Sequence, residues 1–381
     1  LVGSEMCIRD SYTASGFAAC GKLFSSLFGV KYLTAMIISA IVIVAYTTLG
    51  GFLAASTTDF IQSIIMSVAL IVVLIFGVET AGGIGAVIHN ASELPGYLSM
   101  TLSYDVNTGK AAPYSALTIV STAAWGLGYF GMPHILLRFM AIEDEKKLKL
   151  SRRVATIWVV ISLFVAVFIG VIGYTMSKVG ALEMLTGSNS ETIIVKISAL
   201  LSQHGVIFAL LAGVILAGIL ASTMSTSDSQ LLAASSAVSS DILGAFRKDS
   251  SNKNGSMAAA RITLLVISVV AAFIARNPDS SVFAIVSFAW AGFGAAFGPV
   301  VLFSLFWKRT NKWGALAGMV CGGSMVFIWK YLIRPLGGIW NIYELLPAFL
   351  IACAAIVIVS LLTPKPSKEI EEEFDRVAQM K

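Results

Sequence analysis

The most chemically informative part of this chain is a run of hydroxyl and carboxyl side chains that directly continues an apolar segment. Positions 206–220 are almost entirely apolar, and residues 221–230 read Ala-Ser-Thr-Met-Ser-Thr-Ser-Asp-Ser-Gln. An unpaired hydroxyl or a charge at membrane depth is costly, so such groups normally face a cavity, an ion or a substrate path. The run therefore predicts a binding site inside a membrane protein.

Three hydroxyl residues of this run have the spacing of one helix face. Ser222, Ser225 and Thr226 stand at i, i+3 and i+4, and such positions are neighbours on an α-helix. Hydroxyl and carbonyl oxygens suit a hard cation such as sodium. The residues alone leave a second interpretation equally open, in which these hydroxyls are polar contacts that hold helices together.

Two carboxylates lie in or near apolar segments. Asp228 follows the hydroxyl residues on the same predicted helix and would line a water-filled inner vestibule into which an ion escapes. Asp59 would lie about 9 Å into the bilayer when counted from Leu53 at 1.5 Å per residue. That depth is shallow enough for a residue of the membrane interface.

A second cluster combines aromatic residues with residues that weaken helices. Trp125 and Tyr129 stand four residues apart, which would stack them on one face of an α-helix, and Pro133 follows one turn later. This proline and three nearby glycines weaken the helix near its middle, as expected where backbone groups face a ligand. Without other information, an aromatic stripe of this kind is more often core packing.

The composition places these elements in a bilayer. Hydrophobic residues make up 57% of the chain and charged residues 12%, against roughly 25% charged in soluble domains. Apolar segments of about 17–25 residues span the hydrocarbon layer. Nine such segments lie near 31–51, 53–77, 114–137, 154–176, 205–227, 258–275, 282–306, 314–333 and 343–362. The chain is predicted to be an all-α polytopic membrane protein.

The charge distribution predicts its orientation. The connections 138–153, 247–261 and 308–312 and the tail after Pro364 hold 17 of the 26 basic residues. Because Lys and Arg accumulate on the cytoplasmic side of short loops, we expect a cytoplasmic C-terminal tail, 364–381, and an outward connection 78–112. This topology accounts for the net charge of +5 without a nucleic-acid partner.

Motifs for enzymatic or metal chemistry do not emerge from the sequence. The four cysteines form no CxxC pair, and the three histidines are scattered. We find no phosphate-binding glycine motif, nucleophile elbow or paired carboxylates in a convincing context. We therefore expect neither an enzyme nor a bound organic cofactor.

The first eleven residues differ abruptly from the rest. They are charged and aperiodic, and they lack the basic start and apolar stretch of a signal peptide. The string Ser-Glu-Met-Cys-Ile-Arg-Asp-Ser (4–11) resembles translated sequencing-adaptor text. We interpret residues 1–11 as a non-native leader.

Several motifs occur in the same order as in one transporter family. They are Tyr-Thr-Ala-Ser-Gly (12–16), Tyr-Thr-Thr-Leu-Gly-Gly-Phe-Leu-Ala (46–54), Thr-Asp-Phe-Ile-Gln (58–62), Trp-Gly-Leu-Gly-Tyr-Phe-Gly-Met-Pro-His (125–134), Met-Ser-Thr (224–226), Ala-Trp-Ala-Gly-Phe-Gly-Ala-Ala-Phe-Gly-Pro (289–299), Trp-Lys-Arg (307–309) and Gly-Ala-Leu-Ala-Gly (314–318). On these motifs the chain resembles, from Tyr12 to about Leu362, the sodium:solute symporter family and, within it, the sodium/proline symporters.

The resemblance implies a leucine-transporter-type fold, with two inverted repeats of five helices that meet at a midplane site. Judged against the family, the chain is expected to be N-terminally truncated, without the first core helices. The second repeat, about 113–306, is expected to be whole and followed by two peripheral helices. The transmembrane domain would span 12–363.

The resemblance also implies the roles of the candidate residues. The sodium ligands would be the Ser222 carbonyl and the Ser225 and Thr226 hydroxyls, and a carboxylate at Asp59 would lie on the sodium exit route. The rings of Trp125 and Tyr129 with Pro133 would pack on the pyrrolidine ring of proline, and Tyr12 would complete the pocket. Met132 stands where close proline relatives are expected to carry Gln, which leaves fine specificity open.

The implied function is sodium-coupled import of proline by alternating access, in a multi-pass protein of the prokaryotic cell membrane. Its partners would be proline, sodium and the bilayer, and no covalent chemistry is required. Two alternatives remain open at this point. One is a sodium symporter for another small organic solute, and the other is a membrane sensor domain.

Overall fold

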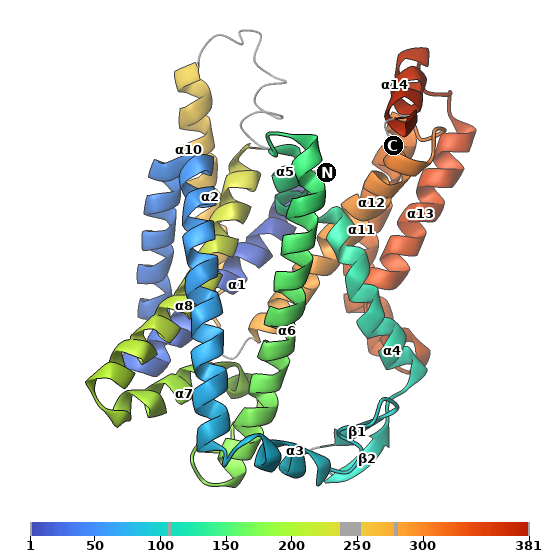
Figure 1. Cartoon of the computed structure of the whole chain (residues 1–381). Coiled ribbons are helices and arrows are strands. Elements are labelled where there is room, and N and C mark those ends of the chain that lie inside the picture. The colour runs from blue at the N-terminus through green and yellow to red at the C-terminus, as the bar shows by residue number, and fades with distance from the viewer. Residues whose placement is uncertain (1, 106–107, 237–252, 278–280, 380–381) are drawn as a thin grey trace. The chain divides into compact units, whose positions relative to one another are not determined.

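The computed structural model describes residues 2–105, 108–236, 253–277 and 281–379 (Figure 1). Within these residues, seven helices or helix segments are long and apolar enough to span a membrane. They are Tyr32–Leu49, Ser56–Thr80, Glu145–Lys178, Val206–Ala233, Val282–Phe306, Lys312–Leu336 and Leu345–Leu362. Each coincides with one of the nine predicted segments.

The other two predicted segments have a different form. The segment predicted at 258–275 belongs to α10 (Lys253–Ile274), whose apolar described part is Ala260–Ile274. The segment predicted at 114–137 is a broken helix, formed by α4 (Ala116–Ala123), the 3-10 helix η1 (Ala124–Gly131) and α5 (Pro133–Met140). The predicted weak point in this segment is therefore a real interruption.

Proline explains where this interruption ends. Met132 is extended, with φ −82° and ψ 108°, because the ring of a following proline disfavours helical backbone in the residue before it. Pro133 then begins α5, a position where its missing N–H costs nothing.

The described chain forms two compact units. The larger unit consists of Asp10–Tyr114 and Ile142–Ile285, and the smaller unit of Leu1–Arg9, Ser115–Ala141 and Val286–Lys381.

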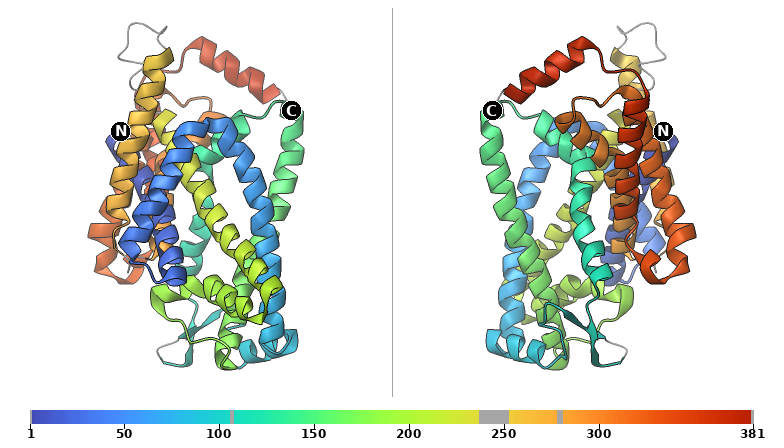
Figure 2. Two further views of the ribbon diagram at one scale, coloured as in Figure 1. Left: turned by 90° about the vertical axis from the view of Figure 1, so that its left-hand side faces the viewer. Right: turned by 90° about the vertical axis from the view of Figure 1, so that its right-hand side faces the viewer.

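The larger unit contains most of α1 (Val2–Phe28), together with α2 (Tyr32–Thr80), α3 (Ile84–Ser92), α6 (Leu148–Lys178), α7 (Ile193–Leu201), α8 (Val206–Ser236), α10 and the first residues of α11 (Val282–Phe306). α2 holds two of the membrane-length segments, and α2 and α8 lie side by side (Figures 1 and 2). The apolar core of the larger unit is formed by α2, α6, α7 and α8. Its residues Val73, Ile172, Ile197 and Ile215 are at most 1% exposed.

The connection 78–112 is more structured than the sequence suggested. It carries α3 and then a hairpin of β1 (Leu102–Asp105) and β2 (Lys110–Pro113). The two strands are antiparallel, with Leu102 opposite Pro113 and Asp105 opposite Lys110. Among the residues that the structure describes, this hairpin is the only β element.

The smaller unit contains the broken helix, most of α11, α12 (Lys312–Ile328), α13 (Leu345–Leu362) and α14 (Lys368–Gln379). α12 packs against α13, where a Cβ on Gly318 would overlap the Ile356 side chain. α14 lies within the predicted tail 364–381, and Asp375 on it accepts a hydrogen bond from Lys308 Nζ at 2.5 Å.

Candidate sodium and substrate sites

The hydroxyl side chains of α8 fall into two groups according to the residues that they contact. Ser225 Oγ and Thr226 Oγ1 each donate a hydrogen bond to the Ser222 carbonyl oxygen, at 3.2 Å in both cases. Ser222 is exposed, and Ser225 and Thr226 are half-buried. Three oxygens therefore converge within about one turn of α8.

The second group of hydroxyls packs α8 against α1. Thr223 Oγ1 lies 3.2 Å from Cys20 Sγ. Ser227 is fully buried, and a Cβ on Gly16 would overlap its hydroxyl oxygen. Thr223 and Ser227 are thus the hydroxyls that hold helices together, whereas the three predicted sodium ligands are not part of this contact.

The two predicted ion-pathway carboxylates lie close together in the larger unit. Asp228 is fully buried, and its Oδ2 accepts a hydrogen bond from the Tyr46 hydroxyl at 2.9 Å. Asp59, on the second segment of α2, is close enough for its charge to act on both Asp228 and Tyr46. Two neighbouring carboxylates repel each other when both are ionised, and a cation beside them would offset that repulsion.

Tyr46 is a residue that sequence reasoning did not assign to the site. Its hydroxyl lies 3.3 Å from the Met224 carbonyl oxygen in addition to its bond with Asp228. It stands in a family motif, but its partner on α8 is 182 positions away. Local spacing carries no signal for such a contact.

In the smaller unit, the broken helix carries an aromatic cluster. The Trp125 ring is nearly parallel to the Trp290 ring, with centroids 5.4 Å apart and an interplanar angle of 15°. Tyr129 meets the same Trp290 edge-on, with centroids 4.8 Å apart. Trp290 Nε1 also donates a hydrogen bond to the Trp125 carbonyl oxygen at 2.9 Å, which satisfies a backbone acceptor in the interrupted helix.

The 3-10 geometry changes how the two predicted rings are related. With about 3 residues per turn, positions i and i+4 no longer lie on one face, so the α-helical spacing argument does not apply to Trp125 and Tyr129. Trp290 on α11 brings them together instead. Tyr129 remains 47% exposed and Pro133 half-buried, while Trp290 is only 5% exposed.

Glycine allows the broken helix to approach α11 closely. A Cβ on Gly131 would overlap the Phe293 carbonyl oxygen and would lie 2.7 Å from the Gly298 nitrogen. Both neighbours are backbone atoms of a helix and cannot move aside. The close packing of η1 on α11 therefore depends on the absence of a side chain at Gly131.

The predicted substrate residue Tyr12 has no described side chain, and the two predicted sites lie in different units. Tyr12 lies in α1, and its side chain is outside the described residues. The hydroxyl face of α8 and the aromatic cluster belong to different units. Each group is therefore characterised by its own contacts.

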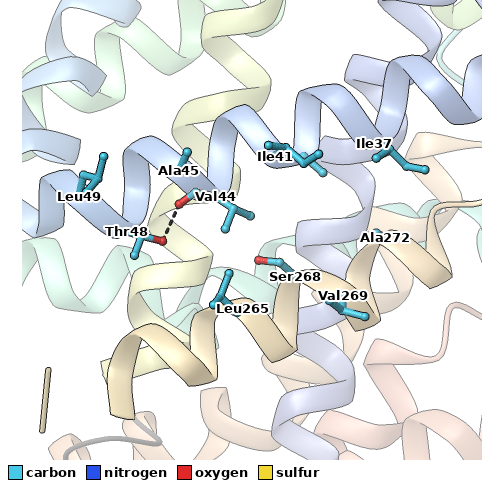
Figure 3. A pocket seen from close by; sticks show the side chains of 11 residues that line it. Ile37, Ile41, Val44, Ala45, Thr48, Leu49, Leu265, Ser268, Val269 and Ala272 are labelled. Carbon is cyan, nitrogen blue, oxygen red and sulfur yellow. Dashed lines mark hydrogen bonds between the residues drawn. The ribbon is translucent and has the colours of Figure 1, made fainter. Parts of the chain in front are cut away.

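One groove in the larger unit offers a contrast to these polar groups. It has a volume of about 590 Å³ and lies between the first segment of α2 and α10 (Figure 3). Its two hydroxyl residues, Thr48 and Ser268, donate to the Val44 and Leu264 carbonyl oxygens of their own helices. The groove is therefore an apolar surface suited to hydrocarbon and unsuited to a charged solute.

The sequence of this chain matches those of known proteins over most of its length. Residues 4–322 match the sequence model of the sodium:solute symporter family. The chain is 38% identical to the osmoregulated proline transporter OpuE of Bacillus subtilis, over 94% of this chain and 69% of OpuE. It is 40% identical to the sodium/proline symporter of Haemophilus influenzae, over 96% of this chain and 71% of that protein.

A solved structure supports the same assignment at the level of the fold. A Na⁺-coupled sialic acid symporter, in its substrate-bound outward-open state, superposes with a TM-score of 0.75 over 96% of this chain and 74% of that chain, at 17% identity. The predicted leucine-transporter-type fold is confirmed by this likeness. The match over most of the chain means that it belongs to the sodium:solute symporter family, a family of transporters and not of enzymes.

Proposed function

We propose that this protein imports proline together with sodium by alternating access. The observation that carries the choice of substrate is its 38–40% identity to two proline carriers over 94–96% of the chain. The hydroxyls of Ser225 and Thr226 on α8 support the choice of ion, because they supply oxygen ligands without full charges, as sodium prefers.

For sodium, the proposed ligands on α8 are the Ser222 carbonyl and the hydroxyls of Ser225 and Thr226. Each of these two hydroxyls lies 3.2 Å from the Ser222 carbonyl oxygen, which supports this set. Asp228 and Asp59 would form the next stop on the ion's inward route. Their proximity favours a cation there, and the Tyr46 hydrogen bond holds Asp228 in place.

For the solute, the proposed contacts on the broken helix are Tyr129, Trp125 and Pro133. Proline has an apolar ring, which suits aromatic faces, and a zwitterionic end that needs polar partners such as free backbone groups of an interrupted helix. The exposure of the Tyr129 ring supports a direct contact with the solute.

The proposal also includes an orientation of the chain in the membrane and an energy source for solute accumulation. The distribution of Lys and Arg favours a cytoplasmic tail 364–381 after a transmembrane domain 12–363, in the cell membrane of a prokaryote. One sodium ion crossing a potential of 100 mV supplies about 2.3 kcal/mol, which corresponds to roughly 40-fold accumulation of solute.

The proposal is tested by transport in proteoliposomes that contain the full-length protein. An inward sodium gradient should drive accumulation of radiolabelled proline, and an equal potassium or choline gradient should not. Excess unlabelled proline should compete, and other amino acids and small organic solutes should compete weakly. Sodium-driven uptake of a different solute with no uptake of proline would replace proline as the substrate. Binding without any transport would favour the sensor alternative.

A further inference from the structure

The connection between α12 and α13 reaches into the aromatic cluster. It runs through the short helices η6 (Trp329–Ile333), η7 (Arg334–Leu336) and η8 (Gly338–Asn341) to Tyr343, just before α13. We propose that Tyr343 is a positioning residue that fixes the Trp125 ring, so that this peripheral connection shapes the solute pocket. The functional part of this inference rests on the function proposed above.

Three contacts of Tyr343 converge on the elements that form the aromatic cluster. Its ring is nearly parallel to that of Trp125, with centroids 5.9 Å apart and an interplanar angle of 15°. Its backbone N–H donates to Ser121 Oγ on α4 at 3.1 Å. Its hydroxyl donates to the Ser287 carbonyl oxygen on α11 at 2.5 Å. A single residue thus contacts the indole, the helix before it and the helix that carries Trp290.

Neighbouring charges hold Tyr343 in place. The adjacent Glu344 has a side chain that is 1% exposed and accepts a hydrogen bond from Arg334 Nη1 at 2.8 Å. Arg334 Nε also donates to Asn341 Oδ1 at 3.0 Å. Lys330 Nζ lies 3.9 Å from the centroid of the Phe288 ring on α11, a favourable cation–π contact. The connection is therefore tied to α11 before Tyr343, and Glu344, just after Tyr343, is tied back to Arg334.

Trp125 needs such external support because it lies in a 3-10 helix. Hydrogen-bond geometry is poorer there than in an α-helix, so the backbone constrains the ring less. The indole has two nearly parallel neighbours, Trp290 and Tyr343. Tyr129 contacts Trp290. Loss of the Tyr343 ring should therefore disturb Trp125 and leave the Tyr129 contact in place.

The transport test compares Tyr343→Leu, Tyr343→Phe and the control Leu332→Ala, which alters a 69% exposed residue of the same connection. Removing one aromatic stack should raise the KM for proline about 3- to 10-fold, with Vmax, membrane abundance and half-saturating sodium unchanged. Tyr343→Phe keeps the ring, so its KM should stay within about twofold of the parental value. The control variant should give the same result. If the Tyr343→Leu variant is not inserted into the membrane, Tyr343→Met takes its place in the comparison.

Coupling to Trp125 is the decisive part of this test. In a Trp125→Leu background, Tyr343→Leu should cause no further rise in KM, because its target is gone. A full additional rise in that background, or a parental KM in Tyr343→Leu alone, would overturn the proposal.

A spectroscopic measurement separates this inference from the proposed function. The protein is labelled with 5-fluorotryptophan, and the Trp125 resonance is assigned from its absence in Trp125→Phe. Tyr343→Leu should shift that fluorine resonance, whereas Leu332→Ala should not. A shift in a protein that fails to carry proline would uphold the positioning contact while refuting the proposed substrate. An unshifted resonance would refute the positioning contact whatever the protein transports.

Discussion

The hydroxyl face of α8 and the aromatic cluster of the broken helix arrange their proposed ligand groups in opposite ways. α8 is a regular helix of 31 residues, and its spacing brings Ser222, Ser225 and Thr226 together, whereas contacts with α1 identify Thr223 and Ser227 as packing residues. The broken helix has no such periodicity, and contacts from α11 and the α12–α13 connection arrange its rings. A regular helix encodes a site locally, and an interrupted helix depends on distant partners.

The largest effect should come from filling the space where the broken helix meets α11. Gly131→Ala places a Cβ against backbone atoms of Phe293 and Gly298, so η1 must separate from α11 and transport should be lost. Gly126→Ala is the matched control, since its Cβ would meet no atom within 4 Å. Uptake normalised to membrane abundance checks this. Parental activity in Gly131→Ala would show that the close approach is not needed.

The next effect concerns sodium and tests the local encoding on α8. Ser225→Ala and Thr226→Ala each remove an oxygen, which should raise half-saturating sodium roughly 10-fold or more. Thr226→Ser keeps the oxygen and should be tolerated. Thr223→Ala, three residues away, should reduce membrane abundance without changing half-saturating sodium, because Thr223 packs against Cys20. Equal sodium titrations for Thr226→Ala and the parent would identify its hydroxyl as a packing group.

A third prediction distinguishes the two aromatic residues. Tyr129→Ala and Trp125→Ala should both raise the KM for proline, by about 10-fold, through lost ring contacts. Trp125→Ala should also lower membrane abundance, because its ring packs on both Trp290 and Tyr343. Radiolabelled uptake and immunoblots of the membrane fraction measure the two quantities. An unchanged KM in both variants, at equal abundance, would remove these rings from the solute pocket.

The smallest effect lies outside both regions, at Glu191 in the connection between α6 and α7. Burial alone would raise the pKa of Glu191, but hydrogen bonds from Lys22, Ser281 and the Val282 and Phe283 N–H groups outweigh it and lower the pKa. Its contribution to stability is therefore present above the usual Glu pKa and is lost as the pH falls through the lowered value.

Glu191→Gln should accordingly reduce stability at neutral pH by about 1 kcal/mol or less, as for other partly exposed ion pairs. The difference from the parent should shrink on acidification toward pH 4 and below. Thermal unfolding in detergent at a series of pH values measures it. A difference that grows at acid pH would contradict the assigned direction. Substrate KM and half-saturating sodium should not change at neutral pH.

How far the sequence predicts this molecule depends on the range of each contact. The length of the apolar segments identified seven membrane-length helices among the nine predicted spans, and the i, i+3, i+4 spacing predicted the convergence of Ser222, Ser225 and Thr226. The break near Pro133 was also evident, because proline acts on its immediate neighbours. These are local properties of the chain.

The remaining features depend on partners distant in the sequence. Trp290 bonds to Trp125 across 165 positions, and the Tyr343 N–H reaches Ser121 across 222. Periodicity carries no information about such pairs. The hairpin of β1 and β2 was missed for another reason, since strands of four residues are too short to give a clear alternating pattern.

The most direct test of the division between ion and solute sites is a crossed titration of Thr226→Ala and Tyr129→Ala in proteoliposomes. Sodium is varied at saturating proline, and proline is varied at saturating sodium. Thr226→Ala should shift mainly the sodium titration, and Tyr129→Ala mainly the proline titration, each by about 10-fold. The reverse pattern, or equal shifts of both titrations in both variants, would contradict the assignment of sodium to α8 and of the solute to the broken helix.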